Sequence, residues 1–236
     1  MIITVKSPLL STNDIADPTS YETVLDSLTI TEKRLVAHGL DQFIVFNQAY
    51  VVVTDTIAEH AAHGYFSHPG FVEQFTVAFA QRYVQIVREI ITSNDSSSAA
   101  WNRLLDASSH PHCIQLLMGA NAHINHDLPL VMAEYFDQSD INGLSRDIMS
   151  VDALLLESGR KIIPLFSEPY RSLRFIKSHL RPLYYIPIMS MVLSWRVAAW
   201  RSYRLIRKNG IDNAQYQNRS VRIADRLLTV GQFLKF

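Results

Sequence analysis

The sequence has little of what defines several large classes of protein. Its single cysteine, Cys113, excludes an internal disulfide, and only 8 glycines in 236 residues leave few sites for β-hairpin turns. The 22 basic and 22 acidic side chains cancel, so the molecule lacks the overall positive field that attracts nucleic acid. The longest apolar run, residues 183–195, is interrupted by proline and serine and is shorter than the roughly 20 residues that span a bilayer. We therefore expect a protein that neither crosses a membrane nor binds nucleic acid.

What remains is typical of a helical, globular chain. Apolar residues make up 48% of the sequence and recur three and four positions apart over long windows, the spacing of helix faces. We expect an all-α fold, a single-domain bundle of about eight helices over residues 18–236, preceded by an irregular arm over residues 1–17. The opening MIITVKSPLL has too short an apolar run for a signal peptide, which favours a cytoplasmic location. The expected helical segments are residues 18–36, 41–63, 69–91, 101–106, 111–123, 127–136, 144–163, 170–180, 188–208 and 220–236.

Charge is divided unevenly along the chain. Residues 1–170 hold 9 basic and 20 acidic side chains, whereas residues 171–236 hold 13 and 2. This asymmetry predicts that the basic C-terminal helices, residues 170–236, pack on an acidic body, and contact with an anionic partner is the alternative. The helix expected over residues 188–208 is basic and amphipathic, so a membrane surface or an acidic protein could bind to it peripherally. Its cationic face comprises Arg196, Arg201, Arg204, Arg207 and Lys208.

The densest cluster of chemically active side chains is the segment HPHCIQLLMGANAHINHDLP, residues 110–129, which holds four of the nine histidines. His123 and Asp127 are four positions apart, so on one helix their side chains share a face. An imidazole beside a carboxylate can act as a base with its orienting acid, or it can bind zinc, iron or manganese. Asn121 is the third catalytic candidate, and Gly119 leaves room for a substrate or a crossing helix. In a purely structural interpretation, Asp127 is only the N-cap of the next helix.

A metal centre needs three or four protein ligands, so His123 and Asp127 would require further side chains. The two candidates are His126 and Asp147. His126 could equally point to solvent, and Asp147 lies on the helix expected over residues 144–163.

Four other side chains are candidates for holding a substrate. Two are polar positions within an otherwise apolar helix, and two are arginines that could bind an anionic group. They are Asn47, Tyr50, Arg82 and Arg196.

The segment LLMGANAHINHDLPL, residues 116–130, resembles the signature of an uncharacterised, mainly bacterial family, domain-of-unknown-function family 5995. Further segments resemble that family in the same order, so the resemblance covers about residues 35–208. They are residues 46–83, 147–155 and 194–200. The chain departs from the usual family residues, which are methionine, tyrosine and asparagine, at Ala120, His126 and Asp152. The resemblance implies one helical domain in which Asn121, His123 and Asp127 matter together, and it implies no known reaction.

A more distant similarity is to zinc-dependent phospholipase C and the P1-type nucleases. These helical enzymes also carry a histidine and an aspartate four positions apart on a helix, as His123 and Asp127 are here. The similarity implies a zinc-type phosphoester hydrolase. Those enzymes also need further histidines and an N-terminal tryptophan ligand, whereas the first tryptophan of this chain is Trp101.

Two classes of function follow from these observations. The first is an enzyme that acts on a small, largely apolar substrate, as in the biosynthesis of specialised metabolites, because the helices over residues 71–83 and 184–200 are rich in aromatic side chains. Its centre would be His123 and Asp127, working with a metal or by acid–base catalysis. The second is a non-catalytic helical module that docks on lipid or on an acidic protein through the helix over residues 188–208.

Overall fold

The computed structural model describes residues 16–136, 141–162, 174–210 and 214–233, and every regular element within them is helical. The helices are α1 (Tyr21–Ala37), α2 (Asp41–Ala62), α3 (Pro69–Ser93), α4 (Ala99–Leu105), α5 (His112–Asn121), η2 (Ala122–Asp127), α6 (Leu128–Tyr135), α7 (Ile141–Ile162), α8 (Arg174–Asn209) and α9 (Ala214–Phe233). Because α5, η2 and α6 follow one another without a break, the described residues form eight separate helices. The expected all-α bundle of about eight helices is confirmed.

Local sequence signals set the boundaries of the first helices. Ser20 caps α1, because its side chain accepts a hydrogen bond from the Thr23 amide and its own amide donates to the Thr23 hydroxyl. α2 ends before Gly64, whose φ of +75° lies in the left-handed region that glycine adopts without strain. Pro69 occupies the first turn of α3, where a backbone N–H is not needed. Helix ends in this part of the chain are therefore encoded locally.

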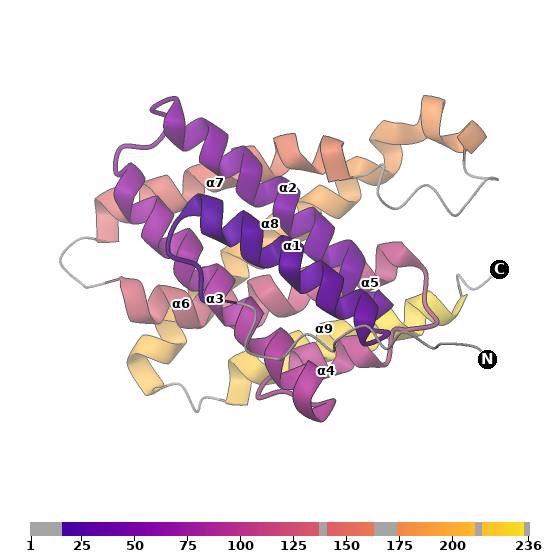
Figure 1. Ribbon diagram of the computed structural model, residues 1–236. Coiled ribbons are helices and arrows are strands. Elements are labelled where there is room, and N and C mark those ends of the chain that lie inside the picture. Colours follow the sequence, from indigo (N-terminus) through magenta and orange to yellow (C-terminus); the bar gives the residue numbers. More distant parts are fainter. Residues whose placement is uncertain (1–15, 137–140, 163–173, 211–213, 234–236) are drawn as a thin grey trace, which may run out of the picture.

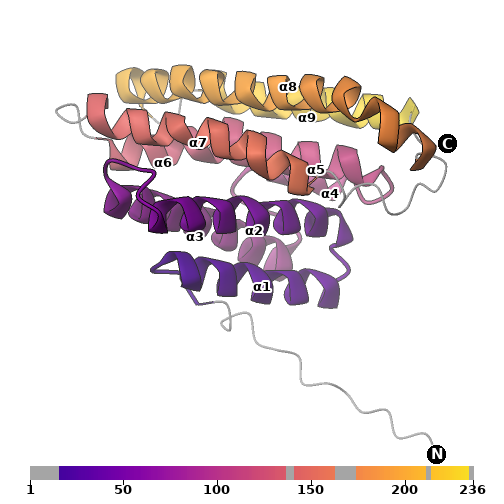
Figure 2. The ribbon, with the colours of Figure 1, turned by 90° about the horizontal axis from the view of Figure 1, so that it is seen from above.

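The helices stack in layers (Figure 1). Figure 2 shows α1 on one side, α2 and α3 next to it, α5, α6 and α7 beyond them, and α8 and α9 on the opposite side. One core cluster contains side chains from each of the helices α1 to α5, around Phe43 and Trp101. A second contains side chains from α3, η2, α6 and α8, around Phe136. η2 contributes Ala122 to the first cluster and Ile124 to the second, so the histidine-rich segment lies between them, in the middle of the bundle.

α8 differs from the sequence prediction. It is one continuous helix through Pro182 and Pro187, whereas two helices were expected, over residues 170–180 and 188–208. A proline removes one backbone hydrogen bond and bends a helix, but it need not end one, and the exposed ring of Pro187 displaces no packed neighbour. None of the described helices combines the length with the apolar composition that crossing a bilayer requires. The N-terminal arm expected over residues 1–17 lies almost wholly outside the described residues.

Candidate functional site

The histidine-rich segment forms a π-helical turn within a longer helix. α5 continues into η2 and then into α6, and all six residues of η2 are buried. A π turn makes i→i+5 hydrogen bonds, holds more residues than the 3.6 of an α turn, and is frequent at functional sites. Residues four apart lie on one face of the helix, and the side chains of His123 and Asp127 meet there. α6 begins at Leu128, close to the expected start at Asp127, but it continues η2 without a break, and the side chain of Asp127 makes no capping hydrogen bond.

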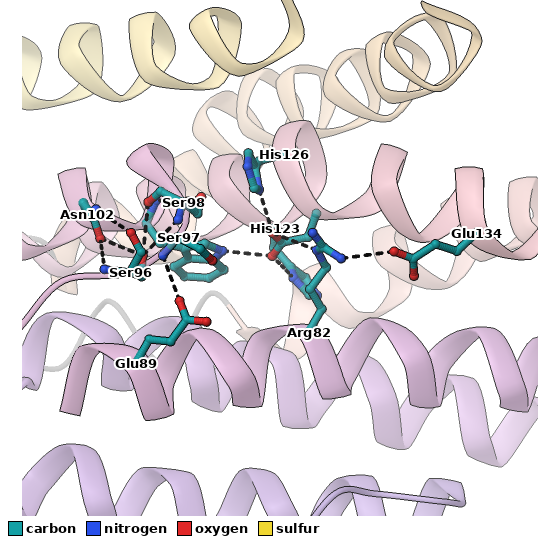
Figure 3. Close-up of polar contacts among 11 residues, drawn as sticks. Arg82, Glu89, Ser96, Ser97, Ser98, Asn102, His123, His126 and Glu134 are labelled. Carbon is teal, nitrogen blue, oxygen red and sulfur yellow. Dashed lines mark hydrogen bonds and ion pairs between the residues drawn. The ribbon is translucent and has the colours of Figure 1, made fainter. Parts of the chain in front are cut away.

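Asp127 is fully buried, and its carboxylate is the centre of a hydrogen-bond network. Oδ2 accepts hydrogen bonds from Trp101 Nε1 at 2.9 Å and His123 Nδ1 at 3.1 Å, and Oδ1 accepts one from His126 Nδ1 at 2.9 Å. Arg82 Nε lies 3.9 Å from Oδ1. Figure 3 shows Arg82, His123 and His126 close together. Burial favours the neutral acid, but the hydrogen bonds from the two histidines outweigh it and hold the pKa of Asp127 far below its ordinary value. The carboxylate is therefore ionised at neutral pH.

His123 is buried and held in one orientation. Because its Nδ1 donates to an ionised carboxylate, Nε2 carries the lone pair, and Nε2 is buried without a hydrogen-bond partner among the described residues. Burial lowers the pKa of His123, and the neighbouring Asp127 opposes the shift in part. The ring of Phe79 is stacked on it, with centroids 3.5 Å apart. The rings that surround His123 are those of Phe46, Tyr50, Phe79, Tyr83 and Trp101.

His123 lines an apolar cavity of about 170 Å³ between α2, α3, the α5–η2–α6 run, α7 and α8. The lining is apolar apart from Tyr50, Thr76, His123 and Arg196. The buried hydroxyl of Tyr50 also has no partner in the described part of the chain, and its ring centroid lies 4.6 Å from that of His123. Burial and, after it, the charge of Asp127 raise the pKa of Tyr50 well above its ordinary value, so the hydroxyl keeps its proton. An engineered apolar cavity of about 150 Å³ binds benzene, so this one suits a small hydrophobic molecule.

Arg196, from α8, is the second predicted substrate-binding residue in the cavity wall. It is buried, its Nε donates to Asp152, and its NH2 group donates to the Ile148 carbonyl at 2.7 Å. Its charge is thus balanced by Asp152, which joins α8 to α7. A guanidinium already paired in this way contributes little attraction for a fully anionic substrate, which agrees with the apolar lining.

Three other candidates lie outside the cavity lining. Asn47 is buried and donates to the Leu28 carbonyl at 2.9 Å, so it joins α2 to α1. Asn121 is buried and donates to the Ser220 carbonyl at 2.8 Å, which joins α5 to α9. Arg82 contacts Asp127 and the exposed Glu134, and Figure 3 shows its contact with Glu134. In the structure these three side chains therefore link neighbouring helices.

Three of the four predicted metal ligands meet, but as partners in hydrogen bonds with one another, and Asp147 lies apart from them. His126 is buried rather than directed to solvent, and its Nδ1 donates a hydrogen bond to Asp127. Asp147 accepts hydrogen bonds from the backbone amides of Ser67 and His68, and so holds the turn before α3 against α7. Across the described residues, no three His, Cys, Asp or Glu side chains form a group that could hold a metal ion.

Two features of the site were missed from the sequence. Trp101 donates to Asp127 from a helix 26 positions earlier, and nothing in its spacing points to that contact. Phe79 and Tyr83 carry a signal, because they belong to an aromatic series repeated every four residues on α3, but that pattern predicts only a buried face. The room left by Gly119 is filled by Phe46 of α2, which confirms a crossing helix rather than a substrate at that point.

The fold and the site define an all-helical protein with a buried histidine–aspartate pair in the wall of an apolar cavity. The chain belongs to DUF5995, a family of unknown function, whose model matches residues 21–235. The resemblance carried by the segment GANAHINHDLP is thereby confirmed. No curated protein and no solved structure matches the chain, so the similarity to zinc-dependent phospholipase C and the P1-type nucleases has no support from these comparisons.

Proposed function

We propose that the protein is an enzyme that uses His123 as a general base on a small, largely apolar substrate bound in the cavity. The observation that supports this function is a buried nitrogen atom that lacks a hydrogen-bond partner within the described structure. Nε2 of His123 is buried and has no partner among the described residues, and the ring to which it belongs lines the cavity. A buried polar atom without a partner costs free energy, so its presence at a cavity wall favours a ligand that supplies the missing hydrogen bond.

The surroundings of His123 suit proton transfer. A base must be neutral at the working pH, and burial lowers the pKa of His123 so that the neutral ring predominates. Asp127 fixes the tautomer and would stabilise the imidazolium formed when Nε2 accepts a proton. The Tyr50 hydroxyl can donate a hydrogen bond to an oxygen of the substrate on which negative charge develops. Apolar walls keep water away and strengthen both interactions.

The apolar lining also supports the substrate class, including a step in the biosynthesis of specialised metabolites. A metal-assisted reaction with zinc, iron or manganese, or a zinc-type phosphoester hydrolysis, has less support, because no three of the described His, Cys, Asp and Glu side chains form a group that could hold a metal ion. Acid–base catalysis without a metal is therefore the version that we test.

The probe reaction is the base-promoted ring opening of 5-nitrobenzisoxazole, a small, flat aromatic molecule. One base removes the proton on C3, the electron pair of that C–H bond forms the nitrile, and the N–O bond breaks to release a coloured phenolate. We expect the protein to accelerate this reaction with saturation kinetics. His123→Gln should remove the acceleration, whereas His63→Gln, at an exposed position after α2, should leave it unchanged.

Binding is measured separately, by the change in tryptophan fluorescence when the probe is added. If the probe binds and reacts no faster than in buffer, or equally fast with His123→Gln, the base is not His123. If the probe does not bind, the cavity is not a site for small aromatic molecules. Either result would refute the proposed function.

A further inference from the structure

A groove with a concentration of arginines runs between α8 and α9, on the side of the bundle opposite α1 (Figure 2). Its volume is about 520 Å³. α8 contributes one arginine and α9 three, and two apolar side chains lie between them. The lining residues are Arg201, Ser202, Leu205, Arg219, Arg222, Ile223 and Arg226.

The positive charges are brought together by helix geometry. Arg219, Arg222 and Arg226 are three and four positions apart, so they share one face of α9. Arg201 reaches the same groove from α8. Burial and, after it, the positive charge of Arg201 lower the pKa of the Arg219 guanidinium, which shows that the two side chains repel each other.

No acidic side chain in the described part of the chain neutralises this groove. The lining contains no Asp or Glu, and no described carboxylate lies within 4.0 Å of its four arginines. Nearby acidic groups are engaged elsewhere: Asp225 of α9 pairs with Arg103 of α4 at 3.0 Å, and Asp152 of α7 pairs with Arg196. The expected packing of basic helices on an acidic body thus accounts for Arg196, whereas the four arginines of the groove have no carboxylate partner among the described residues.

We propose that this groove binds a ligand that carries a diphosphate group. A guanidinium presents a planar fork of N–H donors that matches two phosphate oxygens, and bonds between charged partners are the strongest hydrogen bonds in proteins. Arg219 and Arg226 are seven positions apart, or about 10 Å along the helix, which suits a diphosphate with guanidinium groups on either side. Leu205 and Ile223 offer apolar contact to the rest of the ligand.

A membrane surface fits these observations less well. Peripheral binding to a bilayer needs large exposed apolar side chains beside the cations. In the described parts of α8 and α9 such side chains are Ile186, Val197, Val230 and Phe233, and none of them lines the groove. An extended acidic peptide would need cations spread over a longer surface than these two helical turns.

The test is calorimetric titration of the full chain with inorganic pyrophosphate at low salt. We expect one binding site, weakened at least about tenfold by Arg219→Gln with Arg222→Gln, because each charge-assisted bond is worth about a factor of ten or more in affinity. The matched control is Arg204→Gln with Arg207→Gln, two exposed arginines of α8 that do not line the groove, and it should change affinity less than about twofold. Arg226→Gln, an exposed position, repeats the test if the double variant unfolds.

Several results would overturn the proposal. These are no binding of pyrophosphate, equal weakening by the groove and control variants, or equal affinity for inorganic phosphate and pyrophosphate. Tighter binding of a ten-residue polyglutamate peptide would assign the groove to an acidic protein instead. Sedimentation with phosphatidylserine vesicles that depends on Arg219 and Arg222, without binding of free pyrophosphate, would assign it to a membrane surface.

Discussion

Replacing Asp127 is the most direct test of the buried network, because three N–H donors depend on its carboxylate. Asp127→Leu keeps the branching at Cγ, with a larger side chain, and leaves the donors of Trp101, His123 and His126 without an acceptor. An orphaned buried donor costs about 1–3 kcal/mol, so we expect the free energy of unfolding to fall by at least about 3 kcal/mol.

Asp127→Asn should cost less, about 2 kcal/mol. Its amide oxygen can keep the hydrogen bonds from Trp101 and His123, and its NH2 group can donate to His126 Nδ1 if that ring carries its proton on Nε2. The loss is then the conversion of three charge-assisted bonds, worth at least about 1.5 kcal/mol each, into neutral bonds worth about 1 kcal/mol.

Both variants are measured by urea unfolding at neutral pH, followed by tryptophan fluorescence and circular dichroism. The control is Glu134→Gln, whose exposed carboxylate pairs with Arg82 at 3.4 Å and should contribute less than about 1 kcal/mol. Equal losses for Asp127→Leu and Asp127→Asn, or losses no larger than that of the control, would refute the view that this carboxylate satisfies three donors.

Three further predictions concern the same region. Gly119→Ala places a Cβ 2.6 Å from Cγ of Phe46. The overpacking costs about 1–3 kcal/mol and should exceed the gain in helix propensity of about 1 kcal/mol, so the melting temperature should fall. An unchanged melting temperature would contradict this. Tyr50→Phe removes an unpartnered buried hydroxyl, so the free energy of unfolding should rise, by up to about 1–3 kcal/mol, and a loss of stability would reveal a partner. The pKa of His123 is lower in the folded protein than in the unfolded chain, where it is about 6.5, so the unfolded chain binds a proton first as the pH falls. The contribution of His123 to the free energy of unfolding is therefore complete above pH about 6.5 and is lost as the pH falls towards the folded pKa. His123→Gln should flatten the slope of stability against pH in that range, and an identical slope would assign it to other histidines.

Much of the fold could be predicted from local signals. Capping at Ser20, the stop at Gly64 and the start at Pro69 all depend on residues close in sequence. The structure places the last two boundaries where they were expected, whereas α1 begins at Tyr21 rather than at residue 18. α8 could not be predicted in this way, because whether a helix continues through Pro182 and Pro187 depends on the energy of packing its two halves, which no local pattern reports.

In the site, too, contacts between residues close in sequence could be predicted and contacts between helices could not. Spacing alone predicted that His123 and Asp127 meet, because that contact lies within one turn of one helix. The donor from Trp101 comes from another helix, so it depends on tertiary packing that the spacing of residues does not encode. Asn47 and Asn121 were predicted to act in the site because they are polar residues on apolar helices. The structure instead buries them, and each makes a hydrogen bond to a neighbouring helix.

The π turn also fixes how α6 is rotated relative to α5. Deleting one residue from Ala122–Asp127 would restore α-helical hydrogen bonding and turn everything that follows by about 100°. Leu128, Val131 and Met132, which now face the core, would then point elsewhere, and the partners of Asp127 would separate. Natural variation in the length of this segment should therefore be strongly restricted, even where the identity of its residues is not.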